Sequence, residues 1–331
     1  MSAKASYAVA ADALDGWRDD VLSGKAPVLY AIGAGELARI EVGPGLVTLC
    51  GGAPGAGKTA FTMQAAVDAL RLTPTLRALV CNVEMPPTAL LDRQLARLSS
   101  VDLTTIRYRK LGAEHADRID GAVATLEAVA DRLCFVRPPF DLGNVAAAAD
   151  DFGASLLLLD YIQRIDPPGA GDEARHRVNE TMDYLRQFAD AGVAVIVVSA
   201  VTRSKDSKGR SSYAGDGLNL ASFRESSELE FGADDAFILH PDDDDAEGEL
   251  VKLKHLKSRH GECRTLTLRF DRRRQSFTPV EPSTVGAIAD KSNRMRAFAG
   301  IAASDKSCER LTIAVEQRAK GVEPSTSSLE G

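Results

Sequence analysis

The residues with the clearest chemistry form one short segment. It reads Gly52-Ala53-Pro54-Gly55-Ala56-Gly57-Lys58-Thr59 and matches the pattern G-x-x-x-x-G-K-[ST] at every fixed position. An apolar run at residues 46–50 precedes it and a helical run at residues 60–70 follows. A strand, a glycine-rich turn and a helix start direct several backbone N–H groups and the helix dipole at one anion. The spacing predicts a nucleoside triphosphate site; the alternative is a glycine-rich hairpin with an exposed lysine.

Each part of this segment has an expected role with ATP. Lys58 would reach the β- and γ-phosphates, and Thr59 would hold Mg²⁺. Backbone N–H groups would surround the phosphates. The residues expected to bind the nucleotide are Gly52, Ala53, Pro54, Gly55, Ala56, Gly57, Lys58, Thr59 and Ala60.

ATP hydrolysis also needs a second protein ligand for Mg²⁺. Asp160 ends the run Leu156-Leu157-Leu158-Leu159, which has the composition of a buried strand. In an open parallel sheet, ligands gather at the carboxyl ends of the strands. We therefore expect Asp160 to hold Mg²⁺ together with Thr59.

The base that orients the attacking water is expected at Glu84. The residue after Asp160 is Tyr161, so the base must come from elsewhere in the chain. Glu84 follows the strand-like run at residues 78–83, and a buried carboxylate without a role there would be costly. The alternative for Glu84 is a salt bridge or a helix cap before Thr88.

The elements that must position these residues alternate along the chain, since apolar runs are separated by amphipathic helical stretches. This order predicts an α/β fold with a mostly parallel, twisted sheet flanked by helices. The six expected parallel strands are residues 46–50, 78–83, 133–136, 156–159, 193–198 and 236–239. Residues 250–256 and 265–270 are expected to form an antiparallel hairpin at the edge. Asp242-Asp243-Asp244-Asp245 would be a solvated turn or, as the alternative, a metal site.

The chain divides into three expected parts. Residues 1–25 would form a linker or docking helix, since Ala10, Leu14, Trp17 and Val21 share one helical face. Residues 26–282 would form the ATPase domain. Residues 283–331 would carry a possible helix at 288–302 and a disordered end rich in serine.

Composition is typical of an intracellular enzyme. The 331 residues are 44% hydrophobic, and the net charge of -7 argues against a surface coated for DNA, though not against a basic channel. No apolar stretch approaches the roughly 18 residues of a membrane span. The cysteines, Cys50, Cys81, Cys134, Cys263 and Cys308, lack C-x-x-C spacing. We expect reduced core cysteines in a cytoplasmic protein without a zinc site.

Four further motifs follow the phosphate-binding segment in a fixed order. They are Asn82-Val83-Glu84-Met85-Pro86, Leu159-Asp160-Tyr161-Ile162-Gln163, Phe223-Arg224-Glu225-Ser226-Ser227 and Lys257-Ser258-Arg259-His260-Gly261. Together they resemble the motif series of the DnaB-type replicative helicase C-terminal domain, over about residues 26–280. The family's N-terminal helical domain, which engages primase, has no room in residues 1–25.

The resemblance implies a RecA-like core that assembles as a ring, expected to be a hexamer, with ATP at each subunit boundary and single-stranded DNA in the channel. Arg259 matches the family's arginine finger and Lys257 its companion lysine. Alternation places both on one strand face, and a guanidinium stabilises transition-state charge. The alternative is a solvated edge strand whose charges, Lys252, Lys254, Lys257 and Arg259, block aggregation.

The resemblance also implies a DNA-binding loop in which Arg224, Glu225 and Ser227 approach the DNA backbone. An arginine and backbone amides suit contact with phosphates of any sequence. The polar stretch at residues 204–217 could join the channel or form a loop without a ligand. The run Arg272-Arg273-Arg274 could line a nucleotide or DNA surface, although a solvated turn is the preferred interpretation.

Departures from the family pattern bear on motor function. Ala200 stands where the family has a glutamine that senses the γ-phosphate, and alanine cannot donate a hydrogen bond from its side chain. Ser227 replaces a glycine and Phe231 a glutamine. We therefore expect ATP hydrolysis and ring assembly but inefficient unwinding, with a loader or other replication protein as a possible partner. The alternatives are a RecA- or KaiC-like switch, and an assembly module in which ATP only joins subunits.

Overall fold

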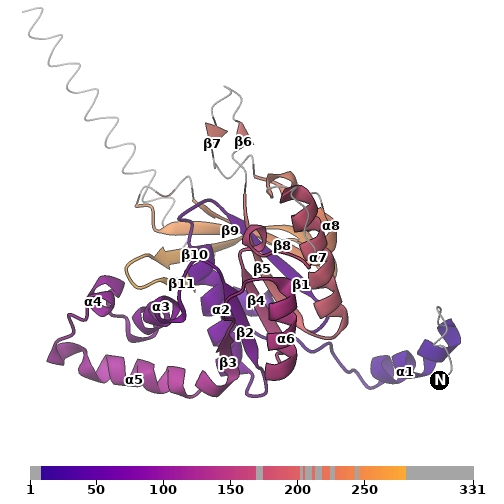
Figure 1. Ribbon diagram of the computed structural model, residues 1–331, viewed down its shortest axis with the longest axis horizontal. Coiled ribbons are helices and arrows are strands. Elements are labelled where there is room, and N and C mark those ends of the chain that lie inside the picture. Colours follow the sequence, from indigo (N-terminus) through magenta and orange to yellow (C-terminus); the bar gives the residue numbers. More distant parts are fainter. Residues whose placement is uncertain are drawn as a thin grey trace, which may run out of the picture.

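The computed structural model describes residues 9–168, 174–201, 204–205, 211–212, 218–223, 228–242, 245 and 247–280. Its main feature is a nine-stranded sheet in the order β11-β10-β9-β8-β1-β5-β4-β2-β3 (Figure 1). The parallel strands are β1 (Val47–Gly52), β2 (Ala78–Asn82), β3 (Leu133–Phe135), β4 (Leu156–Asp160), β5 (Ala194–Ala200) and β8 (Asp235–Pro241). This confirms the predicted α/β fold with a mostly parallel sheet.

The antiparallel part extends beyond the predicted hairpin. It consists of β9 (Leu250–Ser258), β10 (Leu266–Asp271) and β11 (Ser276–Pro279), which are joined in sequence beside β8. The four-residue strand β11 was not predicted, and it forms the edge of the sheet. Two short strands, β6 (Ser204–Lys205) and β7 (Ser211–Ser212), pair separately from this sheet.

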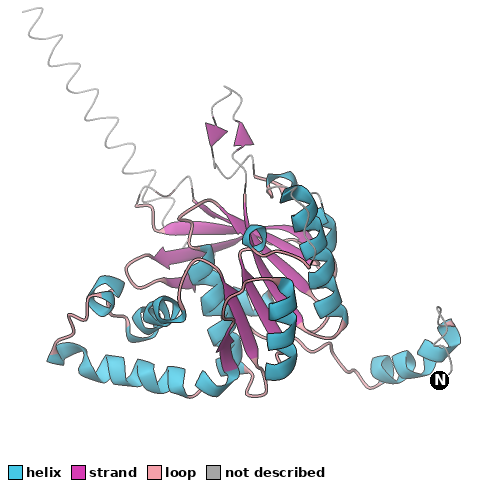
Figure 2. Ribbon diagram, in the orientation of Figure 1, coloured by secondary structure: helices cyan, strands magenta, loops and turns pink. Residues whose placement is uncertain are grey.

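Helices cover both faces of the sheet (Figure 2). On one face, α2 (Lys58–Leu72) packs its buried residues against alternate residues of the parallel strands, such as Val80 and Ile196. On the other face, α6 (Leu142–Phe152) and α7 (Ala174–Asp190) pack against the intervening residues, such as Leu79 and Val197. Because both faces are buried, the parallel strands are continuously apolar, as their sequence predicted.

Smaller helices lie at the periphery. The helices α3 (Pro87–Ser99), α4 (Leu103–Arg107) and α5 (Ala116–Glu127) form a lobe with its own small core, and the short α8 (Glu228–Gly232) lies beside α7. The helix α1 (Ala10–Leu22) lies apart from the sheet in Figure 1, and none of its residues is buried. The apolar side chains predicted to share a face, including Leu14, Trp17 and Val21, are all more than half exposed.

Four cysteines fall within the described residues, and all are free. Cys50 and Cys81 are core residues, as predicted, and burial raises the pKa of each thiol to about 12. Cys263 is exposed in the turn after β9, so its prediction as a core residue was wrong. Within the described part of the chain, no helix is long and apolar enough to cross a membrane.

The acidic run between β8 and β9 acts as a turn where it is described. Asp242 pairs with Lys252 at 2.8 Å, and the carboxylate of Asp245 accepts the backbone N–H of Leu250 at 2.6 Å. These contacts join the two strands and favour the turn interpretation over a metal site. Asp243 and Asp244 lie outside the described residues, as do residues 281–331 with the helix predicted at 288–302.

Candidate nucleotide site and the opposite end of the sheet

Four parallel strands end at one cavity. The strands β1, β2, β4 and β5 end at Gly52, Asn82, Asp160 and Ala200, which adjoin one another at the carboxyl edge of the sheet. A cavity of about 860 Å³ lies there, lined among others by Lys58, Thr59, Glu84, Arg93, Asp160 and Arg272. This is the edge at which open α/β sheets bind their ligands.

The glycine-rich segment forms a tight loop between β1 and α2. Gly57 has φ +95° and precedes the first residue of α2, and a Cβ on it would lie 2.8 Å from Phe270 and from Phe277. Glycine is therefore required there for both conformation and space. The Lys58 ammonium donates hydrogen bonds to the carbonyls of Gly52 (2.8 Å) and Ala53 (3.0 Å). These contacts hold its charge over the loop, where phosphates are expected.

Thr59 and Asp160 are brought together as predicted. The Thr59 hydroxyl donates to Asp160 Oδ2 at 2.6 Å, which joins the start of α2 to the end of β4. Asp160 is only 5% exposed. Burial raises the pKa of its carboxyl, while the Thr59 hydroxyl and the Lys58 ammonium lower it. A buried carboxylate beside a hydroxyl is an oxygen donor set that suits Mg²⁺.

Asn82 was missed by the sequence analysis. Its side-chain NH₂ donates to Asp160 Oδ2 at 2.9 Å, and its carbonyl accepts the backbone N–H groups of Glu84 (3.1 Å) and Met85 (2.8 Å). Asn82 therefore ties the turn that carries Glu84 to the carboxylate of Asp160. The only signal in the sequence was its place at a strand end, two residues before Glu84.

Glu84 lines the cavity with Lys58 and Asp160, but it is exposed, not buried. The expectation that its burial demands a role was wrong, because the chain turns outward directly after β2. Among the described residues Glu84 forms no ion pair, and α3 has no side-chain cap. Both structural alternatives for Glu84 thus lose support, and its carboxylate faces the space where a γ-phosphate and water would lie.

Two arginines add positive charge to this cavity. Arg93 lies on α3; burial lowers the pKa of its guanidinium, and the charge of Asp160 opposes that shift. Arg272 donates to the carbonyl of Gly55 at 2.9 Å and lies over the ring of Phe270. The preferred interpretation of residues 272–274 as a solvated turn was therefore wrong for Arg272. Arg93 was not predicted, since its spacing matches that of any helical arginine.

The end of β5 lacks the expected side-chain donor. Ala200 lines the cavity, and its backbone N–H donates to the side-chain carbonyl of Gln163 at 3.2 Å. Gln163 in turn donates to the Ser199 hydroxyl at 2.8 Å. The next residue, Val201, forms an antiparallel bridge with the buried Phe223. Arg224, Glu225 and Ser227, predicted to contact DNA, lie outside the described residues.

Arg259 and Lys257 lie at the other end of the sheet. Arg259 pairs with Asp234 at 2.6 Å, and the Lys257 ammonium donates to the carbonyl of Ala233 at 2.6 Å. Burial, and next the charge of Arg259, lower the pKa of Lys257. The strand β9 lies between β8 and β10, so the alternative of a solvated edge strand was wrong.

Asp234 is the anchor of this region and was not predicted. Its side chain is 2% exposed, and besides Arg259 it accepts hydrogen bonds from Arg186 (2.5 Å) and from the backbone N–H of Val47 (2.8 Å). A buried carboxylate needs such partners. Arg259 itself remains 43% exposed, so its guanidinium is held in place and still accessible.

Strand register separates the two regions within one chain. The backbone N–H of Arg259 bonds to the carbonyl of Asp234, whose own N–H bonds to Val47, the first residue of β1. The glycine-rich loop begins at Gly52, the last residue of β1. Five residues of strand separate these points by roughly 16 Å. Arg259 therefore points away from the cavity of its own chain.

The fold and the cavity define a P-loop nucleotide-binding domain of RecA type. A solved structure whose title describes it as an ATPase domain superposes with a TM-score of 0.72 at 20% identity, over 83% of this chain and 100% of that one. A DnaB-like replicative helicase, described with its interactions with primase, gives a TM-score of 0.70 at 20% identity, over 85% and 69% of the two chains.

The family follows from the sequence comparison. The chain belongs to the DnaB-like helicase C-terminal domain family, whose model matches residues 42–279. The replicative DNA helicase DnaB of Buchnera aphidicola subsp. Schizaphis graminum is 26% identical over 229 residues, which cover 66% of this chain and 48% of that protein. The chain thus spans about half the length of the curated relatives it matches.

Proposed function

We propose that this chain hydrolyses ATP with Mg²⁺ in a ring of identical subunits, expected to be a hexamer, and acts on single-stranded DNA as a helicase of DnaB type. In this proposal Lys58 and the loop from Gly52 to Ala60 bind the phosphates, and Thr59 and Asp160 hold Mg²⁺. Glu84 activates the attacking water. Arg259 and Lys257 act on the γ-phosphate bound to a neighbouring subunit.

One observation carries the proposal: the two halves of a hydrolytic site lie at opposite ends of the sheet. The cavity holds Lys58, Asp160 and Glu84, whereas the accessible Arg259 is anchored beside the start of β1. An arginine that stabilises transition-state charge must reach the transferred phosphate. A second copy of the chain meets this requirement, since its Arg259 can approach the cavity from outside.

The test uses two variants that damage different halves. Arg259→Ala should retain ATP binding and lose turnover on the order of a thousandfold, as for other arginine fingers. Glu84→Gln should also bind ATP and lose turnover, because an amide cannot accept the proton of water. When the two are mixed, some boundaries combine an intact Glu84 with an intact Arg259, so activity should return.

A matched mixture controls for nonspecific recovery. Lys58→Ala and Glu84→Gln both damage the cavity half, so no boundary in their mixed rings is complete, and activity should stay lost. Recovery in neither mixture, at any ratio, would argue against a shared site. Size measurement with an ATP analogue and a single-stranded oligonucleotide would then show whether a ring forms at all.

The end of β5 supports a second candidate, a switch that hydrolyses ATP without translocating. Ala200 lines the cavity without a side-chain donor, which removes a direct link from the γ-phosphate to the segment before Arg224. The proposed DNA contacts are Arg224, Glu225 and Ser227. Stimulation of turnover by single-stranded DNA would favour the helicase, and DNA-independent turnover would favour the switch.

The flanking segments extend this proposal. We assign residues 26–282 to the ATPase domain and residues 283–331 to a C-terminal tail. Residues 1–25 would link or dock the chain to a neighbour or a replication partner such as a loader. The exposure of Leu14, Trp17 and Val21 on α1 supports the docking role, because apolar side chains gain free energy when a partner buries them.

A further inference from the structure

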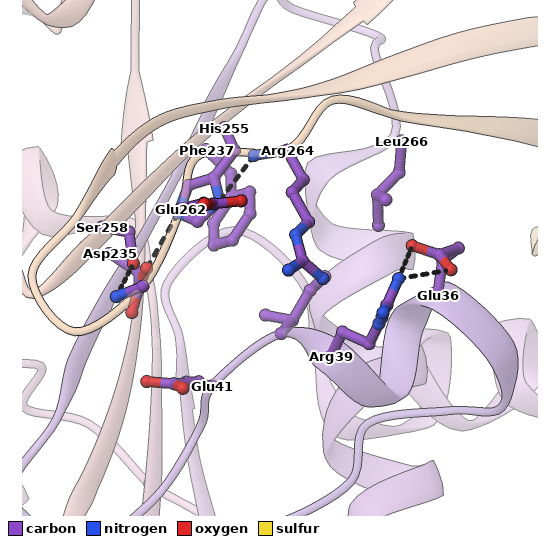
Figure 3. A pocket seen from close by; sticks show the side chains of 12 residues that line it. Glu36, Arg39, Glu41, Asp235, Phe237, His255, Ser258, Glu262, Arg264 and Leu266 are labelled. Atoms are coloured by element: carbon purple, nitrogen blue, oxygen red, sulfur yellow. Dashed lines mark hydrogen bonds and ion pairs between the residues drawn. The ribbon is translucent and has the colours of Figure 1, made fainter.

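A buried carboxylate–histidine pair lies at the base of the turn that carries Arg259. His255 Nε2 is 2.8 Å from Asp235 Oδ1, and their side chains are 10% and 2% exposed. The histidine ring stacks on Phe237, with centroids 4.1 Å apart and an interplanar angle of 18°. Figure 3 shows these three side chains together, beside a cavity of about 130 Å³.

The pairing of β8 with β9 explains how His255 reaches this position. Asp235 and Ala236 pair with Ser258 and Lys257, but Phe237 pairs with His255, so Leu256 is an extra residue in β9. Such a bulge changes the direction of the neighbouring side chains. It turns His255 onto Phe237 directly before the Lys257–Arg259 segment.

The second ring nitrogen of His255 holds the far side of the turn. His255 Nδ1 accepts the backbone N–H of Arg264 at 3.2 Å, drawn as a dashed line in Figure 3. Because Nδ1 is the acceptor, the proton of a neutral ring lies on Nε2, which then donates to Asp235. A single ring thus connects the buried start of β8 to Arg264, across the turn from His255.

Arg259 lies within the segment that this ring closes. The turn leaves β9 after Ser258, whose hydroxyl accepts the backbone N–H of Gly261 at 3.1 Å. Asp234 holds the guanidinium of Arg259, and Asp235, the next residue, holds His255. Two adjacent carboxylates therefore fix the arginine and the backbone on either side of it.

We propose that the Asp235–His255 pair is a positioning pair for Arg259: it holds the 258–264 turn so that Arg259 meets the γ-phosphate of the neighbouring subunit. This inference rests on the proposed function of Arg259. The pair touches no nucleotide; it acts through the turn. Its loss should lower kcat and leave the KM for ATP nearly unchanged, because ATP is bound by the other half of the site.

The expected size follows from the geometry of catalysis. A displacement of about 1 Å can cost on the order of a hundredfold in rate. His255→Phe retains an aromatic ring to stack on Phe237 but removes both hydrogen bonds. We expect kcat to fall by roughly ten- to a hundredfold, which is less than the loss from removing the arginine itself.

Two further variants guard against unfolding and nonspecific effects. His255→Phe leaves Asp235 without its partner in a buried site, which is itself destabilising. The double variant Asp235→Leu/His255→Phe removes that charge too and should show the same loss of kcat. His115→Phe is the matched control, since His115 also accepts a backbone N–H (Gly112, 3.1 Å) beside a carboxylate (Glu114, 3.3 Å), but in the α4–α5 segment. It should leave turnover unchanged.

A double-mutant cycle with Arg259→Ala separates positioning from general structural support. If the pair acts only through Arg259, His255→Phe should cost nothing further once Arg259 is alanine. An equal additional loss in that background would overturn the inference, as would parental kcat in His255→Phe. Parental turnover in Arg259→Ala would instead refute the proposed function itself, so the two failures are distinguishable.

Discussion

The two ends of the central sheet solve different chemical problems with the same strands. At the carboxyl end, Thr59, Asn82 and Asp160 form a closed hydrogen-bonded set in which Asp160 is 5% exposed. At the opposite end, buried Asp234 and Asp235 hold partners that reach the surface, and Arg259 is 43% exposed. One end encloses charge, and the other presents it.

This difference follows from what each end must bind. A metal-binding carboxylate works best where water is excluded, because its interaction with a cation strengthens in a low dielectric. An arginine that serves a second chain must remain accessible until that chain arrives. Each subunit therefore carries two half-sites, and the variants below test how independent they are.

The largest difference between the ends should appear with Lys58→Ala. Its ammonium is the main point charge over the glycine-rich loop, and a charged hydrogen bond contributes roughly 3 kcal/mol. Affinity for a fluorescent ATP analogue should fall by about a hundredfold. Arg259→Ala, at the other end, should keep parental affinity. Equal losses in the two variants would mean that both ends contribute to ground-state binding.

Much of the carboxyl end could be predicted because it depends on local sequence. A glycine-rich turn between a strand and a helix fixes Lys58 and Thr59, and an aspartate at the end of a leucine run fixes Asp160. The partners of these residues could not be predicted, since they depend on strand register. Asn82 pairs with Asp160 only because β2 lies beside β4.

The opposite end was predicted less completely for the same reason. Arg259 and Lys257 were identified through a motif, but their anchors were not. Asp234 and Asp235 stand in an ordinary polar turn of sequence, and only the pairing of β8 with β1 and β9 buries them. The burial of Glu84 was wrongly expected because the length of β2 does not reveal how the chain leaves it.

A smaller effect should show that the carboxyl end works as a connected set. Asn82→Leu removes the link between Asp160 and the turn that carries Glu84. Two backbone N–H groups lose their acceptor, so we expect about a tenfold loss of kcat and weaker Mg²⁺ binding. Asn144→Leu is the control, because Asn144 also donates two hydrogen bonds, to Arg137 and Pro139 (2.7 Å each), in the loop before and the first turn of α6.

The two asparagine variants should separate stability from catalysis. Both should lower the melting temperature, but only Asn82→Leu should lower turnover per folded molecule. Parental kcat in Asn82→Leu would mean that Glu84 is positioned without Asp160, and the carboxyl end would then consist of separate contacts.

The smallest effect concerns pH at the opposite end. Burial and the neighbouring charge of Arg259 lower the pKa of Lys257 below its ordinary value. A lysine carries its charge below its pKa, so turnover that needs this charge should fall as pH rises through the lowered value. We expect a several-fold decline between about pH 8 and pH 10 in the parent. Cys50 and Cys81, with pKa values of about 12, stay neutral over this range and add nothing to the decline.

Replacing the lysine tests the origin of that decline. Arginine stays protonated at every pH used, so Lys257→Arg should move the alkaline limb of the kcat profile to higher pH, with at most a several-fold cost at neutral pH. Lys252→Arg is the control on the same strand; Lys252 pairs with Asp242 near the start of β9 and should leave the limb in place. If Lys257→Arg keeps the parental limb, the titrating group lies at the carboxyl end, and the accessible charge of the opposite end rests on Arg259 alone.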